Sequence, residues 1–565
     1  MGKFEVCIAC DALAEDFQNL SPEYSMMLLV QSLTRFLHLW DEGQLTALSD
    51  PLIRDRVPIV LLQALVRTLQ RQNANGSWGS NQSSEETAYA VLFLVSIFGI
   101  PWVRFLEPQI TSAIEAGRLY LNQYCEGWTK PAPLWIEKVS YGSGVLSQAY
   151  CISAINAPIS TCQGWGEAAK NLIDVKMEAV TKFSQFFSHL PLFCQEPSWK
   201  LRAAVVEGYL FLPHLKRVRL NIFPRKEMAE DKYLEYIPFT WIASNYRGGG
   251  YLSTKLMWDM MIISMLNYQA DEYMEAVVGT QLKDNLEIAK RIVEKLIRET
   301  NGLSYGVKES PVDTSAVSTY DLASIAETDG VINISQIEKT LTRFITYVLD
   351  HPQVQSSSAL DQQILRRELQ NFLLAHIAQI ENNLRFSDQE FSYTIITPFV
   401  APKGTYHKWV HTTSADDTSC PYSFAFMSCL TANPGEDRFP SVQSKYISQD
   451  LCRHLATMCR QYNDYGSIAR DRAEKNLNSV NLPEFHHNNI VKQEGSVENQ
   501  NDVREEAFKA ALFEIADYER DCLLFAMQKL GEAVPKQMGI WKTFVNVTDL
   551  YGQIYVARDN ASRMR

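Results

Sequence analysis

Two groups of oxygen-bearing side chains have the spacing of a site for divalent cations. In the first, Asp271 and Glu275 stand four residues apart, so a helix places both carboxylates on one face, with Glu272 beside them. Carboxylate oxygens suit hard cations such as Mg²⁺. These acids extend a stretch, MWDMMIISML, whose only charge is Asp259, so we expect them at the mouth of an apolar cavity. The alternative is an ordinary solvated helix face.

The second group lies far downstream. Asn463, Ser467 and Asp471 occur at i, i+4 and i+8, which spreads an amide, a hydroxyl and a carboxylate along about 12 Å of one helix stripe. So few carboxylates for several Mg²⁺ ions imply that the substrate brings its own anions, as a phosphate does. Arg460, about one turn earlier, is expected to face that phosphate. The alternative is a polar surface with coincidental spacing.

The elements that must position these groups are predicted to be helices. Alternating strand patterns are few and short, whereas apolar residues recur at helical spacing in many segments, so the predicted fold is all-α. The longest of these segments starts with Glu505 and Glu506, as a helix dipole favours. The predicted helices cover residues 25–39, 60–69, 206–215, 257–266, 286–297, 364–384 and 503–530.

Two composition changes indicate boundaries. Residues 154–164 are rich in small and turn-forming types, which predicts an N-terminal domain of residues 1–160 and a second domain of residues 161–565. The polar stretch 484–502 is long for a loop, so it is predicted to be a mobile lid or a disordered surface segment. We expect His486 and His487 within it to be solvated rather than to bind a metal.

The first domain contains one compact motif, QNANGSWG at residues 72–79, followed by the sequence EETAY. The Asn75-Gly76 pair predicts a turn, and Trp78 is expected to pack at a junction between helices. Glu85 and Glu86 open the next helix, where its dipole favours acidic residues. These roles are structural, so residues 1–160 are expected to supply no catalytic group.

Composition excludes several classes of function. The 565 residues include 53 Lys and Arg against 65 Asp and Glu, and this net charge of −12 argues against a nucleic-acid partner. No stretch is apolar and long enough to suggest a transmembrane segment, and the N-terminus lacks a signal-peptide pattern. The eleven cysteines are scattered and odd in number, which indicates reduced thiols and a cytoplasmic location.

Taken together, the two oxygen stripes resemble the paired metal motifs of class I terpene synthases. The motif around Trp78 resembles the helix-linking element of terpene cyclase β domains, where it is structural. The stretch RDRAEKNLNSVNLPEF, residues 470–485, is similar to the corresponding part of kaurene synthases. Together with segments such as QEPSWKLRAAVVEGYLFLPHLKRVRL and NYQADEYMEAVVG, it makes the chain resemble the C-terminal half of fungal bifunctional copalyl diphosphate/kaurene synthases.

The resemblance implies a domain organisation and a cofactor. It implies a truncated β domain without a γ domain, followed by a class I α-domain bundle that binds three Mg²⁺ ions together with diphosphate. The D-x-D-D acid of class II cyclisation has no match. The nearest sequence, residues 414–417 with Asp416 and Asp417, is predicted to be a loop or helix start with no protonating role.

The resemblance also implies further site residues. The predicted diphosphate-binding residues are Arg460, Arg247, Arg558 and Tyr555. Aromatic rings of the kind that stabilise carbocations through their π faces line the predicted substrate cavity. These are Phe239, Trp241, Tyr268, Phe424 and Trp541. A helix break between Thr418 and Pro421 is expected to face the developing cation.

The predicted function is therefore that of a class I terpene cyclase. It would ionise a small-molecule prenyl diphosphate and cyclise the carbocation to a hydrocarbon or an alcohol. The relatives favour a C20 substrate, either geranylgeranyl diphosphate or a bicyclic diphosphate of the copalyl type. Two alternatives stay open, namely a C15 cyclase of the same class and a catalytically idle helical scaffold.

Overall fold

The computed structural model describes residues 22–45, 52–131, 134–136, 139–159, 164–173, 175–224, 233–249, 252–300, 334–390, 395–486 and 497–557. It confirms an all-α fold. The regular β-structure in these ranges is one antiparallel hairpin of β1 (Leu134–Ile136) and β2 (Val139–Tyr141). The chain divides into two compact units, the first made of residues 1–217, 231–262 and 539–547, and the second of the remainder. The predicted β domain of residues 1–160 stays a prediction.

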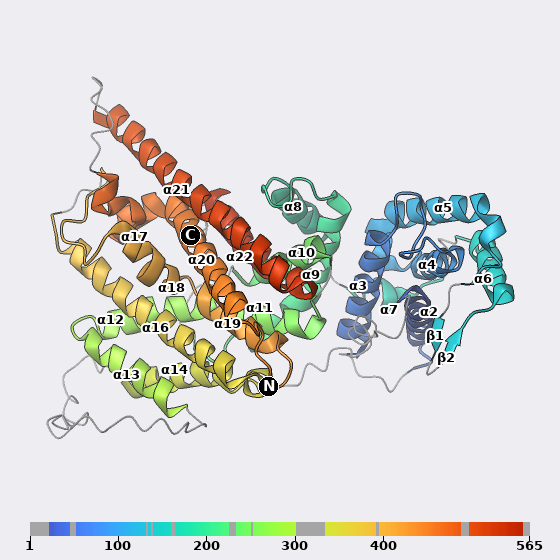
Figure 1. Cartoon of the computed structure of the whole chain (residues 1–565), viewed down its shortest axis with the longest axis horizontal. Coiled ribbons are helices and arrows are strands. Elements are labelled where there is room, and N and C mark those ends of the chain that lie inside the picture. The colour runs from blue at the N-terminus through green and yellow to red at the C-terminus, as the bar shows by residue number, and fades with distance from the viewer. Residues whose placement is uncertain are drawn as a thin grey trace. The chain divides into compact units, whose positions relative to one another are not determined.

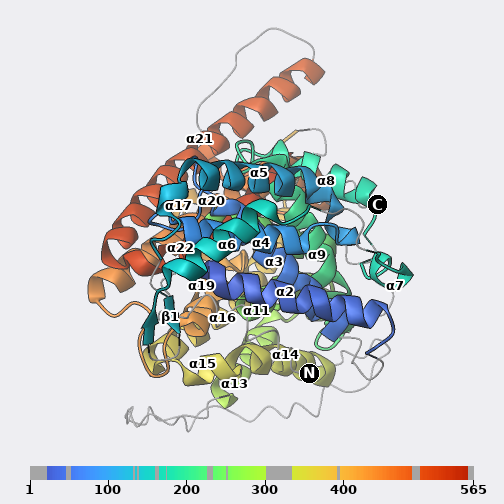
Figure 2. The same cartoon turned by 90° about the vertical axis from the view of Figure 1, so that its right-hand side faces the viewer.

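The first unit is a stack of helices, and Figures 1 and 2 show α2, α5 and α6 packed around α4. Its elements, besides parts of α11 and α22, are α2 (Pro22–Asp41), η1 (Leu52–Arg56), α3 (Val57–Gln70), α4 (Ser84–Ile97), η2 (Pro101–Leu106), α5 (Glu107–Gln123), η3 (Cys125–Gly127), α6 (Gly144–Asn156), α7 (Glu167–Lys170), α8 (Met177–Ser188), α9 (Ser198–Val218) and α10 (Tyr233–Gly248).

The second unit is a bundle of longer helices, in which α20 and α21 run side by side (Figure 1). Its elements are α11 (Thr254–Tyr273, from residue 263), η4 (Met274–Val278), α12 (Gly279–Gln281), α13 (Leu286–Glu299), α14 (Ile334–Leu349), α15 (Pro352–Ser356), α16 (Ala359–Ser387), α17 (Tyr406–Trp409), η6 (Val410–Ser414), α18 (Ala415–Asp417), α19 (Cys420–Thr431), α20 (Val442–Glu474), η7 (Ser479–Asn481), η8 (Pro483–Phe485), α21 (Val497–Ala533), η9 (Pro535–Gln537) and most of α22 (Met538–Ala557).

Apolar periodicity predicted the helices well. Every segment predicted from spacing lies inside an observed helix, and each helix extends beyond it; for example, the segment 364–384 lies within α16. The two ends of the polar stretch 484–502 differ from the prediction, because α21 already begins at Val497 and His486 is bonded, whereas residues 487–496 lie outside the described residues. His486 Nε2 lies 2.9 Å from the Val480 carbonyl and Nδ1 lies 3.1 Å from Arg504. His487 lies outside the described residues.

The motif around Trp78 is structural, as predicted. Trp78 is fully buried, and its indole N–H donates to the Thr68 carbonyl at 2.8 Å while its backbone N–H donates to Thr87 Oγ1 at 3.0 Å. Gln72 donates to the carbonyls of Gly76 and Ala113, which ties α3 to α5. Gly76 has φ of +87°, so the predicted turn needs a residue without a side chain.

None of the helices in the described part of the chain has the length and apolar character that a bilayer crossing requires.

Candidate active site

The first oxygen stripe lies where α11 ends. Asp271 is on the last α-helical turn, and the chain then widens into the π-helical turn η4, which carries Glu275. The two carboxylates are therefore not on one continuous α-helix, although both side chains reach solvent. The side chain of Asp271 is 52% exposed. Single π turns within helices are frequent at functional sites.

A buried ion-pair chain stands directly behind Asp271. His376 on α16 is only 2% exposed, and its Nδ1 lies 3.6 Å from Asp271 and 2.6 Å from Asp417. The other oxygen of Asp417 lies 3.2 Å from Nη1 of Arg460 on α20. Arg460 Nε in turn lies 2.8 Å from Asp464 Oδ1. Three helices, α11, α16 and α20, are thus joined through α18 by alternating charges.

These charges hold one another ionised. Burial alone would lower the pKa of His376, but Asp417, Asp271 and Glu275 raise that pKa to about 9. Burial would raise the pKa of Asp417, yet His376 and Arg460 lower it below its ordinary value. The cluster is therefore charged at neutral pH, although its central groups are almost inaccessible to solvent.

Glu275 behaves differently from Asp417. Desolvation, followed by repulsion from Asp271 and Asp417, raises the pKa of Glu275 to about 8. Crowded acids of this kind are relieved when a cation binds between them, as a divalent metal would.

The second stripe is on α20, as predicted, but its members differ in accessibility. Asn463 is half-buried, whereas Ser467 and Asp471 are buried. Ser467 donates to Asp471 Oδ2 at 2.6 Å, and the Asn478 amide donates to the same oxygen at 2.8 Å. Two of the three oxygen donors are therefore already engaged with the chain, and Asn463 is the accessible one.

Acids of both stripes act electrostatically on one cation. Burial would lower the pKa of Arg460, but Asp464, Asp417, Asp471 and Asp271 raise it. Arg460 therefore lies within electrostatic reach of Asp271 in the first stripe and Asp471 in the second. The guanidinium is held by Asp417 and Asp464 and is 15% exposed.

The donor set fits Mg²⁺ only if an anion takes part. Among the described residues, no three His, Cys, Asp or Glu side chains group closely enough to hold a metal ion. Each stripe offers only one or two accessible oxygen donors. Mg²⁺ is bound by so few protein ligands when waters and substrate phosphates complete its octahedral coordination. The residues therefore suit Mg²⁺ that arrives with a phosphate-bearing molecule.

The structure does not gather all the other predicted site residues. Arg247, in the first unit, donates to the Leu192 carbonyl at 2.9 Å and lies 4.0 Å from Glu196. Tyr555 is half-buried on α22, in the second unit. Arg558 lies outside the described residues. Among the predicted phosphate-binding residues, the Arg460 side chain is in the charged chain beside the stripes, and the Tyr555 backbone lies against Gly466 of α20.

The predicted cavity aromatics separate in the same way. Phe239, Trp241 and Trp541 are buried in the core of the first unit. Tyr268 is on α11 one turn before Asp271 and meets Tyr551 edge to face, with ring centroids 6.0 Å apart. The helix break is confirmed: Ser419 has φ of +62°, and α19 begins immediately after it with Pro421 in its first turn.

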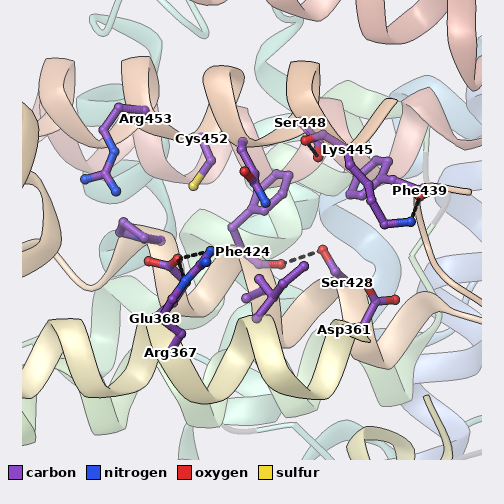
Figure 3. Close-up of a pocket in the computed structure, with 14 residues that line it drawn as sticks. Asp361, Arg367, Glu368, Phe424, Ser428, Phe439, Lys445, Ser448, Cys452 and Arg453 are labelled. Carbon is purple, nitrogen blue, oxygen red and sulfur yellow. Dashed lines mark hydrogen bonds and ion pairs between the residues drawn. The ribbon is translucent and has the colours of Figure 1, made fainter. Parts of the chain in front are cut away.

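Phe424 lines another cavity, of about 230 Å³, between α16, α19 and α20 (Figure 3). Asp361, Arg367, Glu368, Lys445 and Arg453 also line it, which is unlike a hydrocarbon cavity. Tyr422, on a different face of α19, bonds Asn267 of α11.

Sequence reasoning missed His376, Asp417 and Asn478. Asp416 and Asp417 were predicted to be a loop or helix start; they end the short helix α18, where Asp416 pairs with Arg453 at 2.6 Å and Asp417 joins the charged chain. A lone histidine inside a long amphipathic helix gives no signal of its own. The N-L-N-S sequence directly after the second stripe was the one local clue to Asn478.

Comparison with known proteins confirms the resemblance to fungal diterpene synthases. The chain is 40% identical to the pimaradiene synthase of Emericella nidulans, over 98% of this chain and 56% of that protein. It is 34% identical to the ent-kaur-16-ene synthase of Fusarium fujikuroi, over 98% of this chain and 57% of that protein. It is 29% identical to the bifunctional premutilin synthase of Clitopilus passeckerianus, over 96% and 54%.

The chain therefore spans about half the length of the curated relatives it matches, and it is homologous to fungal diterpene synthases over nearly its own whole length. No protein-family model matches the chain. No solved structure is detectably similar to it.

Proposed function

We propose that this chain is a class I terpene cyclase that ionises a C20 prenyl diphosphate in the presence of Mg²⁺. The observation that carries the proposal is the chain of ion pairs that runs from Asp271 through His376 and Asp417 to Arg460 on α20, with the Asp271 side chain open to solvent. A scaffold protein has no use for a desolvated carboxylate such as Glu275 beside a chain of buried charges.

Asp271 and Glu275 would hold Mg²⁺ from one side, and Asn463, Ser467 and Asp471 would hold it from the other. Bound Mg²⁺ would supply Lewis-acid stabilisation of the negative charge that develops on the departing diphosphate. Two of these ligands, Ser467 and Asp471, would first exchange their hydrogen bonds with each other and with Asn478 for bonds to the ion.

The chain's own charges orient the diphosphate. Arg460 is fixed by Asp417 and Asp464, so its guanidinium cannot turn away, and it stabilises the additional negative charge that the diphosphate gains as the C–O bond breaks. His376 keeps Asp417 ionised and in place. The C–O bond at carbon 1 then breaks with both electrons on the diphosphate oxygen, which leaves an allylic carbocation.

The carbocation cyclises when its own double bonds attack it, and loss of a proton or capture of water ends the cascade. Tyr268 is placed for this stage, because it is one turn from Asp271 on the apolar helix α11 and its ring packs on Tyr551. An aromatic face stabilises a nearby cation without reacting with it.

A C20 substrate is favoured by the relatives, which are diterpene synthases. Both geranylgeranyl diphosphate and a copalyl-type diphosphate made by another active centre fit this proposal. The cluster itself recognises the diphosphate end and so does not discriminate among chain lengths.

The test is incubation of the purified chain with farnesyl, geranylgeranyl and copalyl diphosphates, each with Mg²⁺ and with EDTA. We expect Mg²⁺-dependent release of diphosphate and a cyclic C20 product by mass spectrometry. A cyclic product from farnesyl diphosphate alone would correct the chain length. No Mg²⁺-dependent release from any substrate would contradict the proposed function.

A further inference from the structure

Helix α22 meets both helices that carry the oxygen stripes. On one side, Tyr551 of α22 packs against Tyr268 of α11, one turn before Asp271. On another side, α22 lies directly against α20, where Gly552 faces the ring of Tyr462 and Gly466 faces the carbonyl of Tyr555. α22 is therefore one of the helices placed to set the spacing between the two stripes.

The contact between α20 and α22 depends on two glycines. A Cβ on Gly466 would overlap the Tyr555 carbonyl and lie 3.0 Å from its carbon, and that obstacle is backbone. A Cβ on Gly552 would lie 2.7 Å from Cδ2 of Tyr462, which is a side chain and can turn. At Gly466 the backbone of α22 occupies the place of a side chain, so the two helices approach each other closely at this point.

The crossing is adjacent to the second stripe. Tyr462 and Gly466 each immediately precede a predicted ligand, Asn463 and Ser467. Successive helical residues are turned by about 100°, so the face that meets α22 borders the face that carries the ligands. Any movement of α20 away from α22 therefore displaces Asn463 relative to Asp271.

An ion pair fixes this arrangement from a third side. Arg520 of α21 donates to both oxygens of Asp549 on α22, at 3.0 and 2.7 Å, and its Nη2 also donates to the Tyr462 hydroxyl at 2.9 Å. Asp549 is buried and accepts a further bond from Gln553. A bidentate guanidinium–carboxylate pair is geometrically specific, so it fixes the register of α22 against α20 and α21.

We propose that residues 548–557 of α22 act as a spacer that sets the position of the Asn463–Asp471 stripe relative to Asp271, with Gly466, Gly552 and Asp549 as positioning residues. The inference rests on the proposed function, because it concerns the binding of Mg²⁺ and diphosphate. These residues do not touch the substrate; they act through the helix that bears the ligands.

The test measures Mg²⁺-dependent binding of inorganic diphosphate by calorimetry, together with the melting temperature of each variant. In Gly466→Ala, we expect about 10- to 100-fold weaker binding, the range found when groups supporting metal ligands are changed. Turnover should need correspondingly more Mg²⁺ for half-saturation, while kcat at saturating Mg²⁺ recovers most of its wild-type value. The matched control is Gly531→Ala on α21, whose Cβ would meet nothing closer than 3.5 Å.

Two further variants keep the proposal testable if Gly466→Ala does not fold. Gly552→Ala presses only on a side chain, and Asp549→Asn keeps the shape of the residue while weakening its pair with Arg520. Both should weaken diphosphate binding less than Gly466→Ala, and Asp549→Glu should restore part of the loss. If the folded variants bind diphosphate as tightly as the wild type does and differ only in a lower melting temperature, the proposed spacer role is wrong. Absence of Mg²⁺-dependent binding in the wild type would instead contradict the proposed function.

Discussion

Each unit buries a carboxylate among helices, and the two carboxylates are held in opposite ways. In the first unit, Glu207 is fully buried and accepts hydrogen bonds from Gln63 and from the Tyr246 hydroxyl, which are neutral donors. Burial outweighs these bonds and raises its pKa to about 7. In the second unit, Asp417 meets His376 and Arg460, and its pKa falls below the ordinary value.

The difference indicates what each region is for. Neutral donors satisfy the hydrogen-bonding capacity of the Glu207 carboxylate, and its side chain is fully buried, so it is not available to bind a ligand. The pairs of Asp417 with His376 and Arg460 keep these three buried groups charged next to the open carboxylate of Asp271. Buried charges are costly, so their retention here indicates that they act on a ligand. The first region is expected to affect stability alone, and the second is expected to affect turnover.

The largest expected effect is on Asp271. Asp271→Ala removes an accessible carboxylate with little packing, so turnover should fall by about 10²–10³-fold while the melting temperature hardly changes. Steady-state diphosphate release checks the first expectation and thermal unfolding the second. Asp284→Ala, at an exposed acid of the same unit, is the matched control and should behave as wild type. Substantial activity in Asp271→Ala would remove this residue from the site.

Trp78 tests the opposite behaviour in the first unit. Trp78→Ala leaves a cavity and an unsatisfied Thr68 carbonyl, so the free energy of unfolding should fall by about 3–5 kcal/mol. Activity per folded molecule should be unchanged. Denaturant unfolding, with activity normalised to the folded fraction, checks both. Loss of turnover in a fully folded variant would show that the first unit does more than support the structure.

His376 is expected to give the second unit a pH dependence. Its pKa is raised from 6.5 to about 9, so the stability it contributes is present below about pH 6.5 and is lost as the pH rises through about 9. The shift corresponds to about 3 kcal/mol. His376→Gln should flatten the decline of unfolding free energy between those values and also lower turnover. An unchanged pH profile would mean that the buried pair is not ionised.

Glu207 should change stability in a different pH window and, unlike His376, should not affect turnover. Because its pKa is raised from 4.5 to about 7, the folded state binds its proton more tightly than the unfolded chain does. Stability from this group is therefore lost as the pH rises from about 4.5 to 7, by about 3 kcal/mol. Glu207→Gln should flatten that window and leave turnover intact. A loss of turnover in Glu207→Gln would show that the Glu207 carboxylate, like that of Asp417, affects catalysis.

Sequence alone determined the elements and much of the chemistry. Helical periodicity located α2, α3, α9, α13 and α16, because an amphipathic stripe is a local property of the chain. The stripe spacing placed Asn463, Ser467 and Asp471 on α20, and the Asn-Gly pair with Trp78 identified a packing junction. The resemblance to fungal diterpene synthases came from short motifs of the same local kind, and the comparisons confirmed it.

Only the tertiary structure decided which polar groups work together. His376 and Asp417 are far from Asp271 and Arg460 in sequence, and nothing local distinguishes them from an ordinary core histidine and a helix-end acid. Their roles follow from α11, α16, α18 and α20 meeting at one point, where burial strengthens each charge interaction. The same holds for Gly466 and Gly552. The sequence does not show that glycine is required at these positions; the requirement follows from another helix occupying the space that a side chain would fill.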